Sequence, residues 1–166
     1  YLTAGMTIAR DPDSGELNAG IYRHLYLSPK TLTMNMAPLC HLAEITNRAQ
    51  AKGVSVEAAI VLGHHPAMGM ASQQRGAFGE YELETMGGLL GEPVDVVQAE
   101  TVDVPVPADA EIVIEGHIRT DAWEDDGPFG DYWLYYAPPK SARVFEVTAI
   151  TPRYNPLFHD VFPVGP

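Results

Sequence analysis

The stretch "EIVIEGHIR", residues 111–119, alternates polar and apolar side chains. In an extended chain Ile112 and Ile114 point to one side, and Glu111 and Glu115 point to the other. This alternation is typical of a strand with one apolar face on a core and one polar face. We therefore expect a sheet at this point, with Glu111 and Glu115 on its polar side.

Other short apolar runs predict further strands, at residues 19–28, 31–37, 54–63, 93–99, 131–137 and 143–153. A cluster of turn-forming residues at 11–18 separates two apolar runs and indicates a hairpin. Helical spacing of apolar residues predicts one helix over 39–52, and a second helix is expected over 79–91, whereas 64–72 is expected to be a loop. Strands outnumber helices, so the fold class is α+β: either a sheet-rich domain or a barrel with helices packed on it.

Composition and charge limit the classes of function. The chain has 166 residues, 46% of them hydrophobic, which is enough for one domain with a sizeable core. A net charge of -12 disfavours nucleic acid and anionic membrane surfaces as partners. An anionic ligand would need a local cationic site. Because Cys40 is the single cysteine and no apolar run reaches about 20 residues, we expect a reducing, cytoplasmic location without a membrane span.

The two ends of the chain carry a separate signal. The sequence has no initiator methionine, begins in the strand-like "YLTAGMTIA" at 1–9 and ends in "HDVFPVGP" at 159–166 without a polar tail. We expect residues 1–166 to be a single domain excised from a longer protein.

The turn "DDGPFGD", residues 125–131, is a candidate for chemistry. Asp126 and Asp131 bracket a segment in which the glycines permit unusual backbone angles and Pro128 fixes φ. Two carboxylates near one cation form an acid/base device if one stays ionised beside an arginine and the other is protonated in an apolar pocket. The alternative is an ordinary solvated turn between two strands. Taken by itself, the turn favours that alternative.

Asn18, His41 and Glu82 offer an amide oxygen, an imidazole and a carboxylate. This set suits a divalent ion such as Mn²⁺ or Mg²⁺. The sequence alone does not bring the three together, since His41 near a helix start also suits a cap or a core position and Glu82 also suits a solvated helix face. Adjacent His64 and His65 point in different directions on most backbones, which argues against a shared metal.

Six strings of the sequence occur together in one family. They are "LNAGIYR" (17–23), "CHLAE" (40–44), "GLLGEPVDVV" (88–97), "VPADAEIVIEG" (106–116), "DGPFGDYW" (126–133) and "VTAITPRYNPL" (147–157). In their order and approximate spacing the chain resembles the UbiD-family decarboxylases, which use prenylated flavin mononucleotide (prenylated FMN). The resemblance implies the central cofactor-binding domain of a longer decarboxylase. It also implies a split β-barrel like that of flavin reductase-type FMN-binding domains, with flanking helices.

The resemblance implies a cofactor site in the first half of the chain. Asn18, His41 and Glu82 match the residues that hold a divalent metal, usually manganese, which clamps the cofactor phosphate, with potassium often nearby. The matching flavin-lining segment starts at Ala19 and includes Ile21 and Arg23, and the 64–72 loop would also line the flavin. A bound metal would supply the positive charge that this acidic chain lacks overall.

The resemblance also implies a catalytic network of Arg23, Asp126 and Asp131. Arg23 would orient the substrate carboxylate, Asp126 would hold Arg23 by an ion pair, and Asp131 would deliver the proton that replaces CO₂. The first acid is commonly glutamate in the family, so Asp126 is one methylene shorter. Either the turn lies closer to Arg23, or the pairing is looser.

The implied activity is a reversible (de)carboxylase for aromatic, heteroaromatic or α,β-unsaturated acids, acting through a covalent prenylated-flavin adduct. A flavin prenyltransferase would supply the cofactor, and the full-length protein would be a homo-oligomer in which another domain closes over the site. The isolated fragment would then turn over poorly. Two other interpretations remain open: a flavin reductase or electron-transfer domain that uses ordinary FMN, and an assembly domain without a cofactor.

Overall fold

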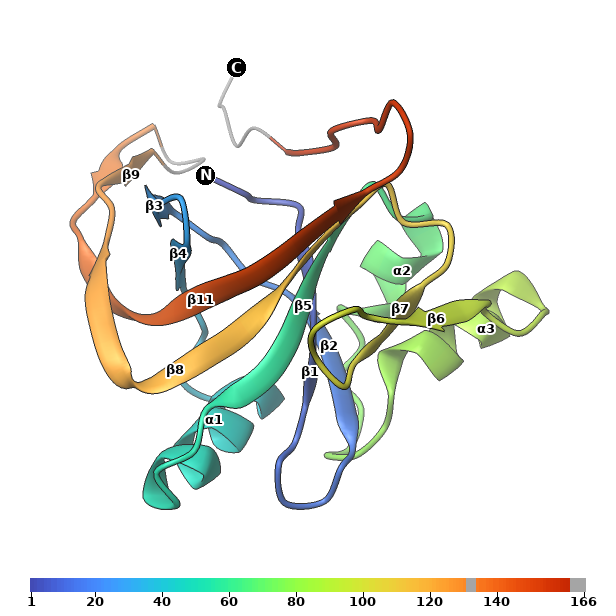
Figure 1. Cartoon of the computed structure of the whole chain (residues 1–166), viewed down its shortest axis with the longest axis horizontal. Helices are drawn as coiled ribbons and strands as arrows, with labels where there is room; N and C mark the ends of the chain where they lie inside the picture. The colour runs from blue at the N-terminus through green and yellow to red at the C-terminus, as the bar shows by residue number, and fades with distance from the viewer. Residues whose placement is uncertain (131–133, 162–166) are drawn as a thin grey trace.

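The computed structural model describes residues 1–130 and 134–161, and in this part of the chain it has a sheet-rich α+β fold (Figure 1). Its main sheet has seven strands in the order β2-β1-β5-β8-β11-β4-β3, and all neighbours are antiparallel. These strands are β1 (Met6–Arg10), β2 (Leu17–Ile21), β3 (Tyr26–Ser28), β4 (Thr31–Met34), β5 (Val56–Leu62), β8 (Ile112–Asp126) and β11 (Lys140–Pro152). The predicted sheet-rich α+β class is thus confirmed.

Smaller elements surround this sheet. The helices are α1 (His41–Ala51), α2 (Pro66–Ala71) and α3 (Glu82–Leu90). Two short ribbons pair β6 (Val96–Gln98) with β7 (Pro105–Pro107) and β9 (Phe129–Gly130) with β10 (Tyr136–Ala137). No helix of the described residues has the length and apolar character that a membrane crossing requires.

The predicted hairpin at the start of the chain is confirmed. Arg10 pairs with Leu17 across the turn, and the carboxylate of Asp11 accepts a hydrogen bond of 2.9 Å from the backbone N–H of Asp13. This local bond is the usual way in which an aspartate opens a turn. The hairpin places β2, which carries several predicted site residues, at one end of the sheet order.

The sheet has a hydrophobic cluster on each face. On β5, Ala59 and Val61 belong to one cluster with residues of α2 and α3, whereas Ala58 and Ile60 belong to the other with residues of α1. Figure 1 shows α1 on one side of β5 and the other two helices on the opposite side. The central strands are therefore buried on both faces.

This two-sided burial overturns the prediction of a polar face on residues 111–119. Glu115 is 1% exposed. Its carboxylate accepts hydrogen bonds from the backbone N–H of Thr101, at 2.6 Å, and from the Thr101 hydroxyl, at 2.8 Å. The alternation was real, but the segment around Thr101 covers the second face and satisfies the buried acid.

Both predicted helices are confirmed as α1 and α3. The thiol of Cys40 caps α1 by accepting from the backbone N–H of Ala43 at 3.4 Å. The loop predicted over 64–72 is wrong, because Pro66 at the first turn and the ring of His65, which accepts from the N–H of Ala67 at 3.2 Å, start the short helix α2 there.

The strand predicted over residues 19–28 is interrupted. The chain leaves β2 after Ile21 and joins β3 at Tyr26. Between them His24 exchanges backbone hydrogen bonds with Leu2, and Arg23 accepts one from the N–H of Asn35 at 3.0 Å. Residues 22–25 therefore connect the two end strands of the sheet, and these backbone hydrogen bonds go to Leu2 before β1 and to Asn35 after β4.

The two longest strands carry the second part of the site. β8 and β11 pair along their length, with register shifts between Arg143 and Phe145 and between Val147 and Ala149. Such irregularities bend a ribbon, and in Figure 1 both strands turn sharply and run up to β9. This bend brings the end of β8, Asp126, to the region of β3 and β4.

Candidate active site

Arg23 and Asp126 meet at this junction. The Nε of Arg23 donates to Oδ2 of Asp126 at 3.1 Å, and its Nη2 contacts the same oxygen. The carboxylate is buried, while the arginine side chain is 24% exposed. The structure thus brings two of the three predicted catalytic residues into contact, and leaves the guanidinium partly open to solvent.

Two residues of the β4 segment complete the surroundings of Asp126. The hydroxyl of Thr33 donates to Oδ1 at 2.8 Å, and the side-chain amide of Asn35 donates to Oδ2 at 2.8 Å. Burial alone raises the pKa of Asp126, but the hydrogen bonds from Arg23, Thr33 and Asn35 outweigh it, so that its pKa lies below the ordinary value. Asp126 is therefore held as an anion, surrounded by donors.

Thr33 and Asn35 were not predicted as site residues. Their spacing of two residues places both side chains on one face of an extended chain, and this was the only signal in the sequence. The signal gains a meaning only when β4 is known to pair with β11, which pairs in turn with the end of β8.

His24 lies buried beside this pair. Its Nδ1 is 3.0 Å from the carbonyl oxygen of Thr33, and its Nε2 is 3.2 Å from the hydroxyl of Thr7. Because a carbonyl only accepts, Nδ1 carries the proton, and a neutral ring then accepts from Thr7. Burial lowers the pKa of His24 to about 4, against smaller raising effects of the Thr33 bond and of Asp126. The neutral ring links β1 to β4 beneath the Arg23–Asp126 contact.

The second group of predicted residues forms around Glu82, the first residue of α3. Its Oε1 accepts from the side-chain amide of Asn18 at 3.0 Å, and its Oε2 accepts from the backbone N–H of Ala19 at 2.7 Å. Burial raises the pKa of Glu82 by more than these hydrogen bonds lower it. The alternative of a solvated helix face is excluded, since Glu82 is 6% exposed.

His41 joins this group at the start of α1. It lines the same small cavity as Asn18, which has a volume of about 10 Å³. Its electrostatic interaction with Glu82 lowers the pKa of that carboxyl. The Oδ1 of Asn18 is buried and has no hydrogen-bond partner among the described residues. A buried oxygen without a donor is costly, and this one lies beside a carboxylate and an imidazole.

These three residues fit a divalent cation. The ligand types suit Mn²⁺ or Mg²⁺, the cavity that Asn18 and His41 line has the size of a single small species, and a cation there would satisfy the unpaired Asn18 oxygen. Within residues 1–130 and 134–161 no cluster of three or more His, Cys, Asp or Glu side chains suits a metal. A metal in this part of the chain therefore needs a ligand of another kind, such as the Asn18 amide.

The remaining predicted residues have different placements. The side chain of Ala19 is buried in the cluster that contains α2 and α3, and Ile21 is partly buried against the same cluster. Of the two, only Ile21 therefore offers side-chain surface to a ligand. Asp131 lies outside the described residues.

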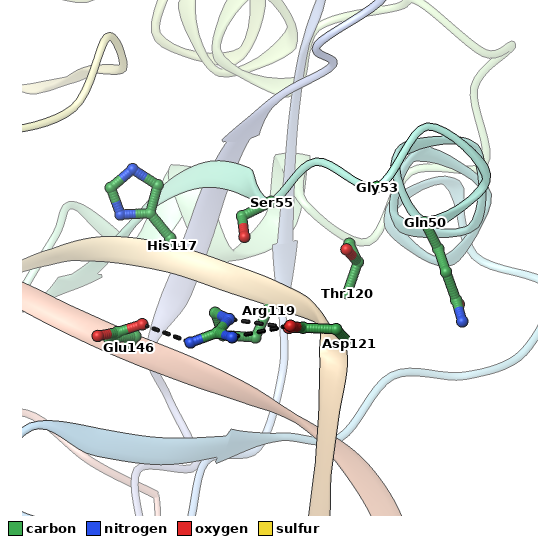
Figure 2. A pocket seen from close by; sticks show the side chains of 8 residues that line it. All are labelled: Gln50, Gly53, Ser55, His117, Arg119, Thr120, Asp121 and Glu146. Atoms are coloured by element: carbon green, nitrogen blue, oxygen red, sulfur yellow. Dashed lines mark hydrogen bonds and ion pairs between the residues drawn. The ribbon is translucent and has the colours of Figure 1, made fainter.

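A groove elsewhere on the surface provides a contrast (Figure 2). It has a volume of about 420 Å³ and is lined by residues of α1, of the segment between α1 and β5, and of β8 and β11, none of them a predicted site residue. Its Arg119 donates to Asp121 at 2.9 Å and to Glu146 at 3.0 Å. Because two carboxylates already neutralise this arginine, the groove is a poor site for an anion.

Comparison with known proteins agrees with the resemblance of the sequence. Residues 1–166 match the model of the 3-octaprenyl-4-hydroxybenzoate carboxy-lyase Rift-related domain of UbiD. The chain belongs to the UbiD family. Its predicted membership is thereby confirmed, and the match extends over every residue of the chain.

Solved UbiD-class structures share the fold. The enzyme HmfF from Pelotomaculum thermopropionicum, in complex with FMN, matches with a TM-score of 0.94 and 44% identity over 98% of this chain and 36% of that one. An evolved dimeric form of HmfF, in complex with prenylated FMN, matches with a TM-score of 0.93 and 44% identity over 98% of this chain and 38% of that one.

A curated relative is similar at the level of sequence. The phenolic acid decarboxylase of Bacillus subtilis is 30% identical over an alignment of 166 positions that covers 98% of this chain and 35% of the relative. The chain thus spans about one third of the length of the relatives that it matches.

Proposed function

We propose that this chain is the cofactor-binding and catalytic domain of a prenylated-FMN-dependent carboxy-lyase, and that residues 1–166 are one domain of a longer protein. The observation that carries the proposal is the contact of Arg23 with a buried, ionised Asp126 at the junction of β2 and β3. The phenolic acid decarboxylase that is similar in sequence and the flavin complexes of HmfF support it. The proposed substrates are aromatic, heteroaromatic or α,β-unsaturated carboxylic acids.

The chain's own residues suit this chemistry. Arg23 is partly exposed, so that its remaining N–H groups are able to bind the substrate carboxylate. Asp126 receives hydrogen bonds from Arg23, Thr33 and Asn35, and therefore keeps Arg23 in place as an anion and does not serve as an acid. The proton that replaces CO₂ is assigned to Asp131, as the family resemblance implies.

Asn18, His41 and Glu82 would hold the Mn²⁺ or Mg²⁺ that binds the cofactor phosphate, and a potassium ion nearby is part of the same proposal. The unpaired oxygen of Asn18 supports this assignment. Ile21 and Arg23 would line the flavin, and Ala19 would contribute through its backbone. When bound, prenylated FMN would supply the electron sink for the loss of CO₂, while the protein provides position and proton.

We also infer that the main sheet closes as a split β-barrel of the flavin reductase type. The two end strands of the sheet order, β2 and β3, belong to one continuous segment, residues 17–28. His24 in this segment bonds to Leu2, and Arg23 bonds to Asn35. Closure would place Arg23 at the seam of the barrel.

An FMN reductase or electron-transfer domain is less well supported. Such a domain has no need of an arginine held by a buried acid. In a carboxy-lyase this arrangement has a function: Asp126, with a donor to each of its oxygens, holds the arginine that would orient a carboxylate substrate. We propose a homo-oligomer for the full-length protein and a flavin prenyltransferase as the supplier of its cofactor.

The test is to co-express the full-length protein with a flavin prenyltransferase, then measure the mass of the bound ligand, the metal content and CO₂ release from a panel of benzoates, cinnamates and furoates. We expect prenylated FMN, about one Mn²⁺ per chain and turnover of at least one acid. Asp131→Asn should keep the cofactor and lose turnover. Bound ordinary FMN without any turnover would instead support the reductase.

A further inference from the structure

The guanidinium of Arg23 is held in an unusual way. Both of its N–H contacts with Asp126 go to one oxygen, Oδ2, which also accepts from Asn35, whereas Oδ1 accepts from the hydroxyl of Thr33. A fork of two N–H groups on two oxygens fixes the plane of a guanidinium. Contacts to a single oxygen fix its distance, but leave the plane free to tilt about that oxygen. Something else must set the plane of Arg23.

Phe129 lies against the open face of this guanidinium. The Cζ of Arg23 is 4.1 Å from the centroid of the Phe129 ring, and is also 5.9 Å from the ring of Tyr1. Stacking of this kind attracts a cation to the face of an aromatic ring and restricts its orientation. The edge of Arg23 is thus held by Asp126, and its face by Phe129.

The ring of Phe129 is itself supported. Tyr1 packs edge-on against it with ring centroids 4.9 Å apart, and the hydroxyl of Tyr1 donates to the carbonyl of Pro128 at 3.0 Å. Phe129 also pairs with Ala137 in the short β9–β10 ribbon. The turn therefore presents a fixed aromatic surface to Arg23, three residues after the acid that anchors it.

We propose that Phe129 is a positioning residue that sets the plane of the Arg23 guanidinium, and so the direction from which Arg23 binds the substrate carboxylate. This inference rests on the proposed function. Asp126 holds Arg23 through one oxygen and so fixes its distance, and the ring of Phe129 fixes the plane of the guanidinium.

The test replaces Phe129 with phenylalanines that carry one, two, three or five ring fluorines, in the full-length enzyme loaded with prenylated FMN. Each fluorine weakens the negative face of the ring while its shape changes little. With an acid that the wild type turns over, we expect kcat/KM to fall in steps, to about one tenth with the fully fluorinated ring, mainly through a higher KM. An unchanged kcat/KM across the series would overturn the proposal.

The chain offers a matched control in Trp123. Its ring stacks on the guanidinium of Arg143 at 4.3 Å, away from the Arg23–Asp126 contact. Fluorinated tryptophan at 123 should weaken that stack and leave KM unchanged. If both series lowered kcat/KM equally, a general effect of fluorination would explain the result and the proposal would fail.

A second measurement does not depend on turnover. Phe129→Leu keeps apolar bulk but removes the ring face, so it should lower the melting temperature of the full-length protein in the wild-type background. In an Arg23→Gln background this loss should shrink by at least half, because the cation is already gone. Equal losses would contradict the stack. The enzyme could turn over none of the acids while the effect of Phe129→Leu still shrank in the Arg23→Gln background. That result would refute the proposed function but would leave the Arg23–Phe129 contact established.

Discussion

Glu82 and Asp126 are both buried carboxylates that bind the same stretch of chain, residues 18–23, yet their surroundings differ. Asp126 receives donors on both oxygens from Arg23, Thr33 and Asn35, and its pKa is lowered. Glu82 receives an amide and a backbone N–H, burial outweighs them, and its pKa is raised. Its neighbour Asn18 keeps a buried oxygen without a partner among the described residues.

The difference indicates two kinds of site in one protein. The Arg23–Asp126 half is complete in the polypeptide alone, so that its geometry is present before any ligand binds. The Asn18–Glu82 half leaves one buried oxygen without a partner among the described residues, and the cation that we propose there would satisfy it. Substitutions in the first half should therefore destabilise the fold directly, whereas those in the second should act through metal binding.

The largest effect should come from Asp126→Asn. The change removes the buried anion and leaves Arg23 without a counter-ion, which we expect to cost about 3 kcal/mol of unfolding free energy and at least about 100-fold in turnover. Urea unfolding and steady-state kinetics of the full-length enzyme check both. Asp126→Glu, which keeps the charge, is the control and should lose less than about 1 kcal/mol. An Asn variant as stable as the wild type would show that this half is not preformed.

A loss of unfolding free energy of similar size should appear at acidic pH, because of His24. Its pKa is about 4 in the folded protein and 6.5 without the fold, so the folded state disfavours the proton. This contribution to stability is complete above about pH 6.5, and is lost as the pH falls toward 4, by about 3 kcal/mol at most. The charged groups that face His24 are Asp126 and, through it, Arg23.

Unfolding free energies measured between pH 7 and 4 check the role of His24. His24→Gln should be less stable at neutral pH but should show a flatter decline in acid. If His24→Gln kept the wild-type slope, His24 would not be the acid-sensitive group.

A smaller effect should follow metal addition. At 100 times its dissociation constant, a cation that binds only the folded state adds about 2.7 kcal/mol, or roughly 5–10 °C in melting temperature. We expect Mn²⁺ to give such a rise in the wild type, EDTA to reverse it, and Glu82→Gln to remove most of it. A comparable rise in the Glu82→Gln variant would place the metal elsewhere. Asp126→Glu should respond to Mn²⁺ like the wild type.

The sequence predicted much of this arrangement where the pattern is local. The hairpin around Asp11 and the helix that begins at His41 follow from turn residues and helical spacing, and both are confirmed. The family resemblance named Arg23 and Asp126, and the structure brings them into contact. Their catalytic roles stay a prediction.

What the sequence did not predict depends on long-range packing. Glu115 alternates like a surface residue but is buried, because a distant segment that contains Thr101 covers it. Thr33 and Asn35 are ordinary strand residues until the bend of β8 brings Asp126 to them. Periodicity reports which face of an element a side chain occupies, but not which segment covers that face.

The smallest effect tests whether the two halves are independent. Cys40 caps α1 with a thiol, a weak acceptor, at 3.4 Å from the N–H of Ala43, and so fixes the turn that carries His41. Cys40→Ser should strengthen the cap by about 0.5–1 kcal/mol and raise the melting temperature by about 1–4 °C, whereas Cys40→Ala should lower it. Because the cap lies on the side of the proposed metal site, kcat and KM should stay within about twofold of wild type in both variants, while the Mn²⁺ affinity follows the order Ser, Cys, Ala. A change in KM as large as the change in Mn²⁺ affinity would mean that the two halves are coupled through β2, and that the Arg23 half is not complete without the metal.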